Sequence, residues 1–544
     1  MKLLRVHIIS AKTCGGLLDR VDIWLRPPNA DIFAFDPLCL IGPNGTGKSQ
    51  FLQVLAEMLQ SAFHACVSDE ERVDGNPDLL FELEYLIRPP GHLTPTYVRV
   101  SRTAEGVASP KVKFETMHEG KWTSCDLSSV ASRHLLPSKV VAYTSGGNET
   151  LSLPFLVSRA GYATEVANRA LDREVADSPV ADTRLMLIDY GTHLEVLAAN
   201  LLLGSSTLRL SLLQNARLVD LHSFRCVVQL AHSAVSRAPR GKSTVSKRKG
   251  IQLTSELEAH LDRLKRCATC YEYDEQSETY IFDYLVSDAT RTAFHHFWKS
   301  TLDLYAAFHK LSMLNDLAIP KRSRERFHRE AKARRFAARL PEPQDEEKVF
   351  RFERVQFSPL TGAQAVDYVS LSDGEHQLAQ LLGTMSMVCF PGVLFILDEP
   401  ESHFNPQWRV ECITQILDVP TCDGPRRGKD GFGKSAEQEC LLTTHSPFVP
   451  SDLHRDKVFI FRKSVKGEVE VDHPHIETYG TTFDTIVEEC FDVRPPISKE
   501  PRQEIGRLSQ SQNAEEIAEG ARHFGDSVEK AILLDRARQL RGKS

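Results

Sequence analysis

The stretch LIGPNGTGKSQFLQVLAEML, from Leu40 to Leu59, has the form of a phosphate-binding loop placed between a strand and a helix. Residues 42–49 fit the pattern G-x-x-x-x-G-K-[ST]. A short apolar run at 38–41 precedes them as a buried strand would, and apolar residues recur at helical spacing after them. Glycines let backbone N–H groups close around phosphate oxygens, and the helix N-terminus adds favourable dipole charge. Six residues are therefore expected to bind a nucleotide, namely Gly42, Asn44, Gly45, Gly47, Lys48 and Ser49.

Two acidic residues end an apolar run in VLFILDEPESHFNP, from Val393 to Pro406. Asp398 is expected to hold Mg²⁺ directly or through water, and Ser49 of the loop is expected to bind the same ion. Glu399 is expected to polarise the water that attacks the terminal phosphate. The stretch therefore predicts the catalytic edge of a nucleotide site.

Two further segments suit the same site. Upstream, SLSDGEHQLAQLLGTM predicts a helix whose start, at Ser372 and Gly374, can bind anionic oxygens. Downstream, CLLTTHSPF predicts a strand that ends in Thr444 and His445. A histidine at the carboxyl end of a strand faces the crevice where open α/β sheets bind ligands.

In this order the four segments resemble the ABC ATPase family, and more narrowly its soluble SMC/RecF/OLD-like branch. The resemblance implies an α/β fold: an ABC ATPase head of two lobes with a mixed sheet and a P-loop. It also implies ATP and Mg²⁺ as cofactors, and a homodimer or higher even oligomer in which ATP clamps two heads together. By resemblance, Ser372 and Gly374 of one subunit contact the γ-phosphate held by the other, and His445 is the γ-phosphate switch. DEPESHFNP is similar to the D-E-P-E-x-x-L-H-P stretch common in OLD-like heads, from which Phe404 and Asn405 depart.

The glutamine of that family's Q-loop has no evident counterpart. SKVVAYTSGGNETL, from Ser138 to Leu151, is a β-rich run that leads into a glycine pair. Asn148 or Glu149 could replace the glutamine. A plain glycine turn at this point is the alternative interpretation.

The chain divides into four predicted parts. Residues 1–150 are predicted to form the N-terminal lobe. Residues 351–475 are predicted to form the C-terminal lobe, which contains the signature residues Ser372 and Gly374, the acidic pair Asp398–Glu399 and His445. Residues 476–544 are predicted to form a helical C-terminal tail. Residues 151–350 are predicted to form a large, mostly helical insertion, compact because sustained heptads are absent. Within it we expect a capping box at Ser255 and Glu258 and one helix over residues 290–314.

Several weaker patterns have plain structural interpretations. Residues 428–435 also read G-x-x-x-x-G-K-S, but a polar Gly/Pro-rich stretch precedes them, so they predict a surface loop. Cys267 and Cys270 form a single C-x-x-C, and His295–His296 lack the partners of an HNH site. Both pairs are interpreted as core residues rather than metal ligands.

Two basic stretches suggest nucleic acid as a partner. Residues 236–250 contain six Lys and Arg residues and no acid, and residues 321–340 form a basic helix with Phe327 and Phe336 interleaved. Each could bind phosphate backbones. The alternatives are a solvated charged face and a partner-docking arm.

Bulk composition limits the possible classes. The 544 residues are 41% hydrophobic and carry a net charge of −7, which excludes a general polyanion binder. No secretory signal or membrane-spanning run is expected, so we predict a cytoplasmic protein with reduced cysteines.

Too little chain follows His445 for a Toprim nuclease domain, so an effector partner is expected. RLMLIDYGTHLEVLAANLLL, VVAYTSGGNET and YGTTFDTIVEECF look like segments of the restriction-system-associated, PtuA-type ATPases of Septu and of some retron anti-phage systems. That resemblance implies an HNH nuclease (PtuB-like) partner and, in a retron, a reverse transcriptase with its RNA–DNA hybrid. The alternatives are a RecF/SMC-like DNA-repair clamp ATPase without a nuclease and a non-hydrolysing nucleotide-bound scaffold.

Overall fold

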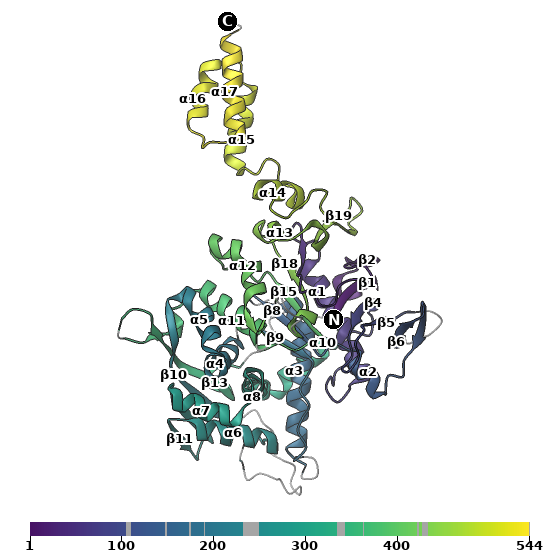
Figure 1. Ribbon diagram of the computed structural model, residues 1–544, viewed down its shortest axis with the longest axis vertical. Coiled ribbons are helices and arrows are strands. Elements are labelled where there is room, and N and C mark those ends of the chain that lie inside the picture. Colours follow the sequence, from purple (N-terminus) through teal and green to yellow (C-terminus); the bar gives the residue numbers. More distant parts are fainter. Residues whose placement is uncertain are drawn as a thin grey trace.

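A computed structural model describes residues 1–104, 110–146, 149–172, 176–189, 191–231, 248, 250–333, 343–362, 364–421, 424–426 and 434–542. Its centre is a seven-stranded sheet in the order β20-β19-β3-β18-β15-β8-β9 (Figure 1). The strands are β20 (Val469–Asp472), β19 (Val458–Lys463), β3 (Leu38–Ile41), β18 (Glu439–Thr443), β15 (Val393–Asp398), β8 (Lys139–Thr144) and β9 (Leu185–Ile188). All neighbours run parallel except β20, which is antiparallel to β19.

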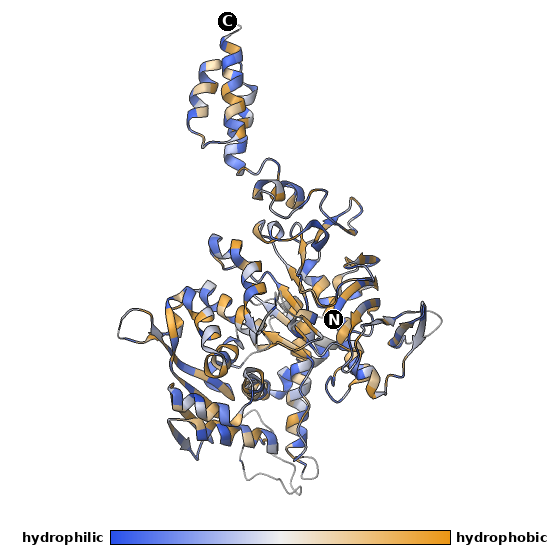
Figure 2. Ribbon diagram, viewed as in Figure 1, coloured by the Kyte–Doolittle hydropathy of each residue, from blue (hydrophilic) through white to orange (hydrophobic). Residues whose placement is uncertain are grey.

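Continuous apolar runs form the central strands because both faces of this sheet are covered. Alternate residues enter two different cores. Leu38, Leu40 and Leu394 face one core, while Cys39, Ile41 and Phe395 face the other. In Figure 2 the strands at the centre of the molecule are accordingly mostly hydrophobic.

The first core lies between the central sheet and a six-stranded antiparallel sheet. That sheet has the order β2 (Val21–Trp24), β1 (Lys2–Ser10), β4 (Leu80–Ile87), β5 (Thr96–Arg102), β6 (Lys113–His118) and β7 (Lys121–Ser124). Helix α1 (Lys48–Cys66) contributes Phe51, Leu55 and Leu59 to the same core. Several of its polar residues are buried, and Glu57 is satisfied there by hydrogen bonds from Gln53 and Asn76. The short helix α2 (Val130–His134) completes this part.

The second core joins the other face of the central sheet to a five-stranded antiparallel sheet. Its order is β11 (Cys270–Asp274), β12 (Thr279–Leu285), β10 (Leu218–Gln229), β13 (Phe350–Pro359) and β14 (Val366–Asp367). The helices of this region are α3 (Glu149–Arg169), α4 (His193–Leu203), α5 (Ser206–Leu213), α6 (Ser255–Cys267), α7 (Asp288–Phe297), α8 (Thr301–Ser312), α9 (Asn315–Ala318) and α10 (Lys321–Ala333). In the described part of residues 151–350 helices outnumber strands, yet β9 of that segment is an edge strand of the central sheet.

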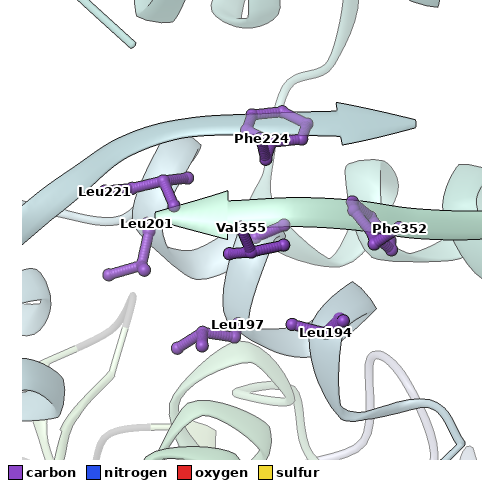
Figure 3. Close-up of a pocket in the computed structure, with 8 residues that line it drawn as sticks. Leu194, Leu197, Leu201, Leu221, Phe224, Phe352 and Val355 are labelled. Atoms are coloured by element: carbon purple, nitrogen blue, oxygen red, sulfur yellow. The ribbon is translucent and has the colours of Figure 1, made fainter. Parts of the chain in front are cut away.

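A small apolar cavity lies where α4 meets β10 and β13 (Figure 3). Its volume is about 10 Å³, and Leu194, Leu197, Phe224 and Phe352 are among its lining residues. A space of this size holds at most one water molecule, and the apolar lining offers it no hydrogen bond. The cavity is therefore a packing gap rather than a ligand site.

Two local predictions were wrong. Residues 290–314 form two helices instead of one, because the Ser300 side chain accepts a hydrogen bond from the Asp303 N–H and starts α8 afresh. No capping box forms at Ser255: the N-cap of α6 is Thr254, and the Ser255 hydroxyl bonds to Asp177.

The remaining helices are α11 (Asp373–Met387), α12 (Pro406–Asp418), α13 (Phe448–Ser451) and α14 (Phe483–Phe491), followed by a bundle of α15 (Lys499–Gln510), α16 (Ala514–Arg522) and α17 (Val528–Arg541). Two short strands, β16 (Pro420–Thr421) and β17 (Gly424–Pro425), pair with each other. Figure 1 shows the bundle projecting away from the rest of the molecule. The predicted α/β class with a helical tail is confirmed, and no helix in the described ranges is long and apolar enough to cross a membrane.

Candidate nucleotide site

The phosphate-binding loop follows β3 and opens α1, as its sequence pattern requires. Gly42, Gly45 and Gly47 all have positive φ, at 134°, 76° and 92°. A Cβ on Gly42 would lie 2.2 Å from the Phe461 carbonyl oxygen, and one on Gly47 would lie 2.9 Å from Leu18. The backbone contact excludes any side chain at Gly42, whereas the end of the Leu18 side chain can shift at Gly47. The positive φ favours glycine at all three positions.

Lys48 lies inside the loop. Its ammonium donates hydrogen bonds to the carbonyl oxygens of Gly42 (2.9 Å) and Pro43 (3.1 Å), and the side chain is buried. Burial lowers the pKa of Lys48 to about 8, against the opposing effect of Glu399 and Asp398. At neutral pH the group is mostly charged and suited to phosphate oxygens.

Two oxygen-bearing side chains that could hold a magnesium ion, Ser49 and Asp398, meet at the end of β15. The Ser49 hydroxyl donates to an oxygen of Asp398 at 3.0 Å, and the Thr443 hydroxyl donates to the same oxygen at 2.5 Å. A hydroxyl and a carboxylate fit Mg²⁺, which takes one or two protein ligands and completes its shell with water and phosphate. No group of three or more His, Cys, Asp or Glu side chains suited to a metal occurs in the described ranges.

Glu399 sits beside Asp398 in a left-handed backbone conformation, with φ of 49°. The Glu399 N–H donates to the Thr443 hydroxyl oxygen at 3.1 Å, which ties this turn to the end of β18. Partial burial, followed by the charge of Asp398, raises the pKa of Glu399. A carboxylate of raised pKa beside the phosphate loop is suited to orient water and accept its proton.

His445 follows β18 and its Nε2 atom lies 3.5 Å from a Glu399 carboxylate oxygen. Burial and the charge of Lys48 lower the pKa of His445 to about 4. The imidazole is therefore neutral at pH 7, and the contact is a polar one rather than an ion pair. A neutral imidazole can donate one hydrogen bond to a phosphate oxygen from this position.

Ser372 and Gly374 stand at the start of α11. Ser372 is exposed, and in the described part of the chain its hydroxyl bonds only within the capping box that it forms with Glu375. A Cβ on Gly374 would lie 2.7 Å from the His403 carbonyl oxygen, so glycine lets α11 approach the turn after β15. The structure thus groups the loop, Asp398, Glu399 and His445, whereas Ser372 contacts none of them.

The proposed Q-loop substitutes cannot be placed. Gly147, Asn148 and the side chain of Glu149 lie outside the described residues. Gln377 of α11, which sequence reasoning missed, donates to the Ser145 carbonyl oxygen at 2.6 Å. The sequence also did not single out Thr443 or Glu401, because each makes its hydrogen bond to a residue at the end of a neighbouring strand. The only signal for Thr443 was the pair of threonines before His445.

The structure describes only part of the weaker sequence patterns. Residues 428–433 lie outside the described residues, and Ser435 is buried in a short turn of 3₁₀-helix. Most of residues 236–250 and Phe336 also lie outside them, while Phe327 of α10 packs against Leu153 and Val157. His295, His296 and Cys270 are exposed, so the interpretation of these three as core residues was wrong; Cys267 is buried as expected.

A larger hollow of about 360 Å³ lies elsewhere, next to Ser138 and Gly392, which precede β8 and β15. It is therefore at the amino ends of the parallel strands, opposite to the loop. Its Arg88 and Arg184 are engaged by Glu437 and Glu70. Ligands of open α/β sheets bind at the carboxyl ends instead, where the loop lies.

Comparison with known proteins bears on the same residues. A family model described as "AAA domain, putative AbiEii toxin, Type IV TA system" matches residues 271–452, which include Ser372, Asp398, Glu399 and His445. The loop after β3 lies outside this range, but β3 pairs with β18, which lies within it.

Among solved structures, the SMC head domain from Thermotoga maritima is similar to this chain at 10% sequence identity. The match covers 88% of this chain and 100% of that chain, with a TM-score of 0.30. A search of curated proteins found no match.

Proposed function

We propose that this chain binds Mg²⁺–ATP in the loop after β3 and hydrolyses it. The observation that carries the proposal is the grouping of Ser49, Asp398 and Glu399, in which a Ser49–Asp398 hydrogen bond of 3.0 Å joins the two halves of the site. The loop and Lys48 bind the phosphates, and Ser49 with Asp398 would hold Mg²⁺, whose charge supplies electrostatic stabilisation. Glu399 orients water and takes its proton, and His445 donates to the terminal phosphate.

The complete site is proposed to form between two copies of the chain. Ser372 is exposed at the N-terminus of α11, where it is free to meet a phosphate held by another subunit. A homodimer or higher even oligomer with ATP at the contact accounts for a signature motif that makes no contact with the loop of its own chain.

The biological role proposed is that of the ATPase subunit in an anti-phage defence complex. The support is the likeness of three segments to the PtuA-type ATPases, and the family model adds a description that names a toxin system. In this role the nucleotide state of the heads controls a partner HNH nuclease, and a retron version would also hold a reverse transcriptase with its RNA–DNA hybrid. A RecF/SMC-like repair clamp remains the second candidate, because the basic helix α10 suits DNA.

The first test is phosphate release by the wild type and by Glu399→Gln, with Glu500→Gln of the exposed C-terminal helix α15 as the control. We expect Glu399→Gln to lower kcat by about 100-fold or more while ATP binding is kept, since the change removes the proton acceptor and not the phosphate contacts. Equal turnover by wild type and Glu399→Gln would reject this role for Glu399. Absence of turnover in the wild type would favour the scaffold.

Purification of the chain expressed with its flanking genes separates the biological roles. A stoichiometric HNH protein supports the defence complex, and a bound RNA–DNA hybrid places it in a retron. A bare dimer whose ATPase activity rises when DNA is added supports the repair clamp instead.

A further inference from the structure

A lysine outside every recognised motif lies over the tip of the phosphate loop. The Cβ position of Gly45 is 4.0 Å from the Nζ atom of Lys463, and apart from the chain neighbours of Gly45 no other heavy atom in the described ranges comes that close. Lys463 is exposed. Its ammonium therefore lies on the Cβ side of Gly45, at the tip of the loop.

The fold fixes the backbone of Lys463 at this place. Strand β19 runs parallel to β3 with Ile460 opposite Ile41, so both strands reach the same edge of the sheet. The next residue, Phe461, sets its carbonyl against Gly42 and its ring 5.5 Å from Phe51 of α1. On its other side, Lys463 pairs with Val469 of β20. The backbone that leads to Lys463 is thus held by β3 on one side and by β20 on the other, so the side chain starts from a fixed position.

The charge of Lys463 is not used elsewhere in the described part of the chain. No carboxylate lies within ion-pair distance of its ammonium, whereas Lys457 of the preceding turn is paired with Asp36 at 2.9 Å. The neighbouring Arg462 donates to the Glu489 carbonyl oxygen at 2.7 Å. Among the cations of this segment, Lys463 is the one that both approaches the loop and lacks such a partner.

The geometry points to Lys463 as a second phosphate-binding cation of the nucleotide site, which contacts the polyphosphate of a nucleoside triphosphate from outside the loop. Lys48 binds the same group from within the loop. The assignment rests on the proposed nucleotide binding and adds a residue that no motif in the sequence marks. A compact ammonium on a flexible stem can follow a phosphate oxygen without a fixed geometry.

The test measures binding of a fluorescent ATP analogue and of the matching ADP and AMP analogues. Lys463→Ala is compared with Lys466→Ala, which removes an equally exposed lysine from the turn between β19 and β20. We expect about tenfold weaker ATP binding for Lys463→Ala, because a hydrogen bond to a charged group is lost. The effect should decrease from ATP to AMP. Lys466→Ala should stay within about twofold of the wild type, and Lys463→Arg should restore most of the affinity.

Added salt gives a second readout. Affinity for ATP should fall less steeply with KCl in Lys463→Ala than in the wild type, since one charge contact is missing. Unchanged binding by Lys463→Ala, or an equal loss in Lys466→Ala, would overturn the assignment while nucleotide binding by the wild type stands. Failure of the wild type to bind ATP would overturn both the assignment and the proposed function.

Discussion

At Gly42 the backbone of the phosphate loop passes directly against the backbone of β19. The residue combines a φ of 134° with a Cβ position 2.2 Å from the Phe461 carbonyl oxygen. Backbone atoms cannot move aside as a flexible side chain would. Glycine is therefore required here by packing as well as by the phosphate chemistry.

Gly42→Ala is expected to lower the free energy of unfolding by about 3 kcal/mol or more, from strain at positive φ plus the backbone clash. Gly91→Ala is the matched control, because Gly91 also has positive φ (81°) but no atom lies within 4 Å of its Cβ position. It should cost only about 1 kcal/mol. Chemical denaturation of both variants measures the difference, and similar losses would show that the approach of Phe461 does not matter.

At the scale of elements, the ends of β15 and β18 are fastened by a buried carboxyl group. Glu401 lies in the turn after β15, is 2% exposed, and accepts a hydrogen bond from the Thr444 hydroxyl after β18. Burial raises the pKa of Glu401 to about 7. The same two strand ends carry Glu399 and His445, so this link helps to hold the site together.

Because the folded pKa of Glu401 lies above the unfolded value of about 4.5, the folded state keeps a proton that the unfolded state loses. The contribution of Glu401 to stability therefore falls as pH rises from about 4.5 to 7, by about 3 kcal/mol at most, and is constant above. Glu401→Gln keeps an acceptor for Thr444 without this titration. Its Tm relative to wild type should rise across that interval and then level off. A difference in Tm that is independent of pH would contradict the raised pKa.

Local motifs predicted some elements well and others poorly. β3 with α1, and β15 and β18, were predictable because in each case an apolar run is followed within a few residues by the polar residues of a recognisable motif. The five-stranded sheet was not, because β10 pairs with β13 from more than 120 residues later in the sequence. For the same reason Glu401, Thr443 and Lys463 escaped sequence reasoning: their positions depend on strands that become neighbours only in the fold.

At the scale of the whole molecule, the C-terminal bundle is a separate small core. Leu508, Ile517 and Leu533 pack with one another, while Ile486 and Cys490 of α14 belong to the main core. In Figure 2 the bundle helices show hydrophobic and hydrophilic residues interspersed, as expected for helices that share a narrow core. The division between head and bundle therefore falls after α14.

A chain ending at Ser498 should keep the Tm and the ATP affinity of the full chain, because the bundle contributes nothing to the cores around the loop. A chain ending at Thr482 should lose about 2–5 kcal/mol of stability, since it also removes Ile486 and Cys490 from the main core. Thermal denaturation of the two truncated chains provides the comparison. A large loss in the first chain would place the boundary elsewhere.

The position of β3 between β18 and β19 has a consequence for synthesis on the ribosome. β3 and its loop emerge early, but both of its partner strands come from residues 439–463, so the loop strand has no neighbour until most of the polypeptide has been translated. At about 5–20 residues per second this wait lasts roughly 20–80 s. The nascent chain must shield an apolar strand during that time, and no nucleotide can assist its folding until the late strands arrive.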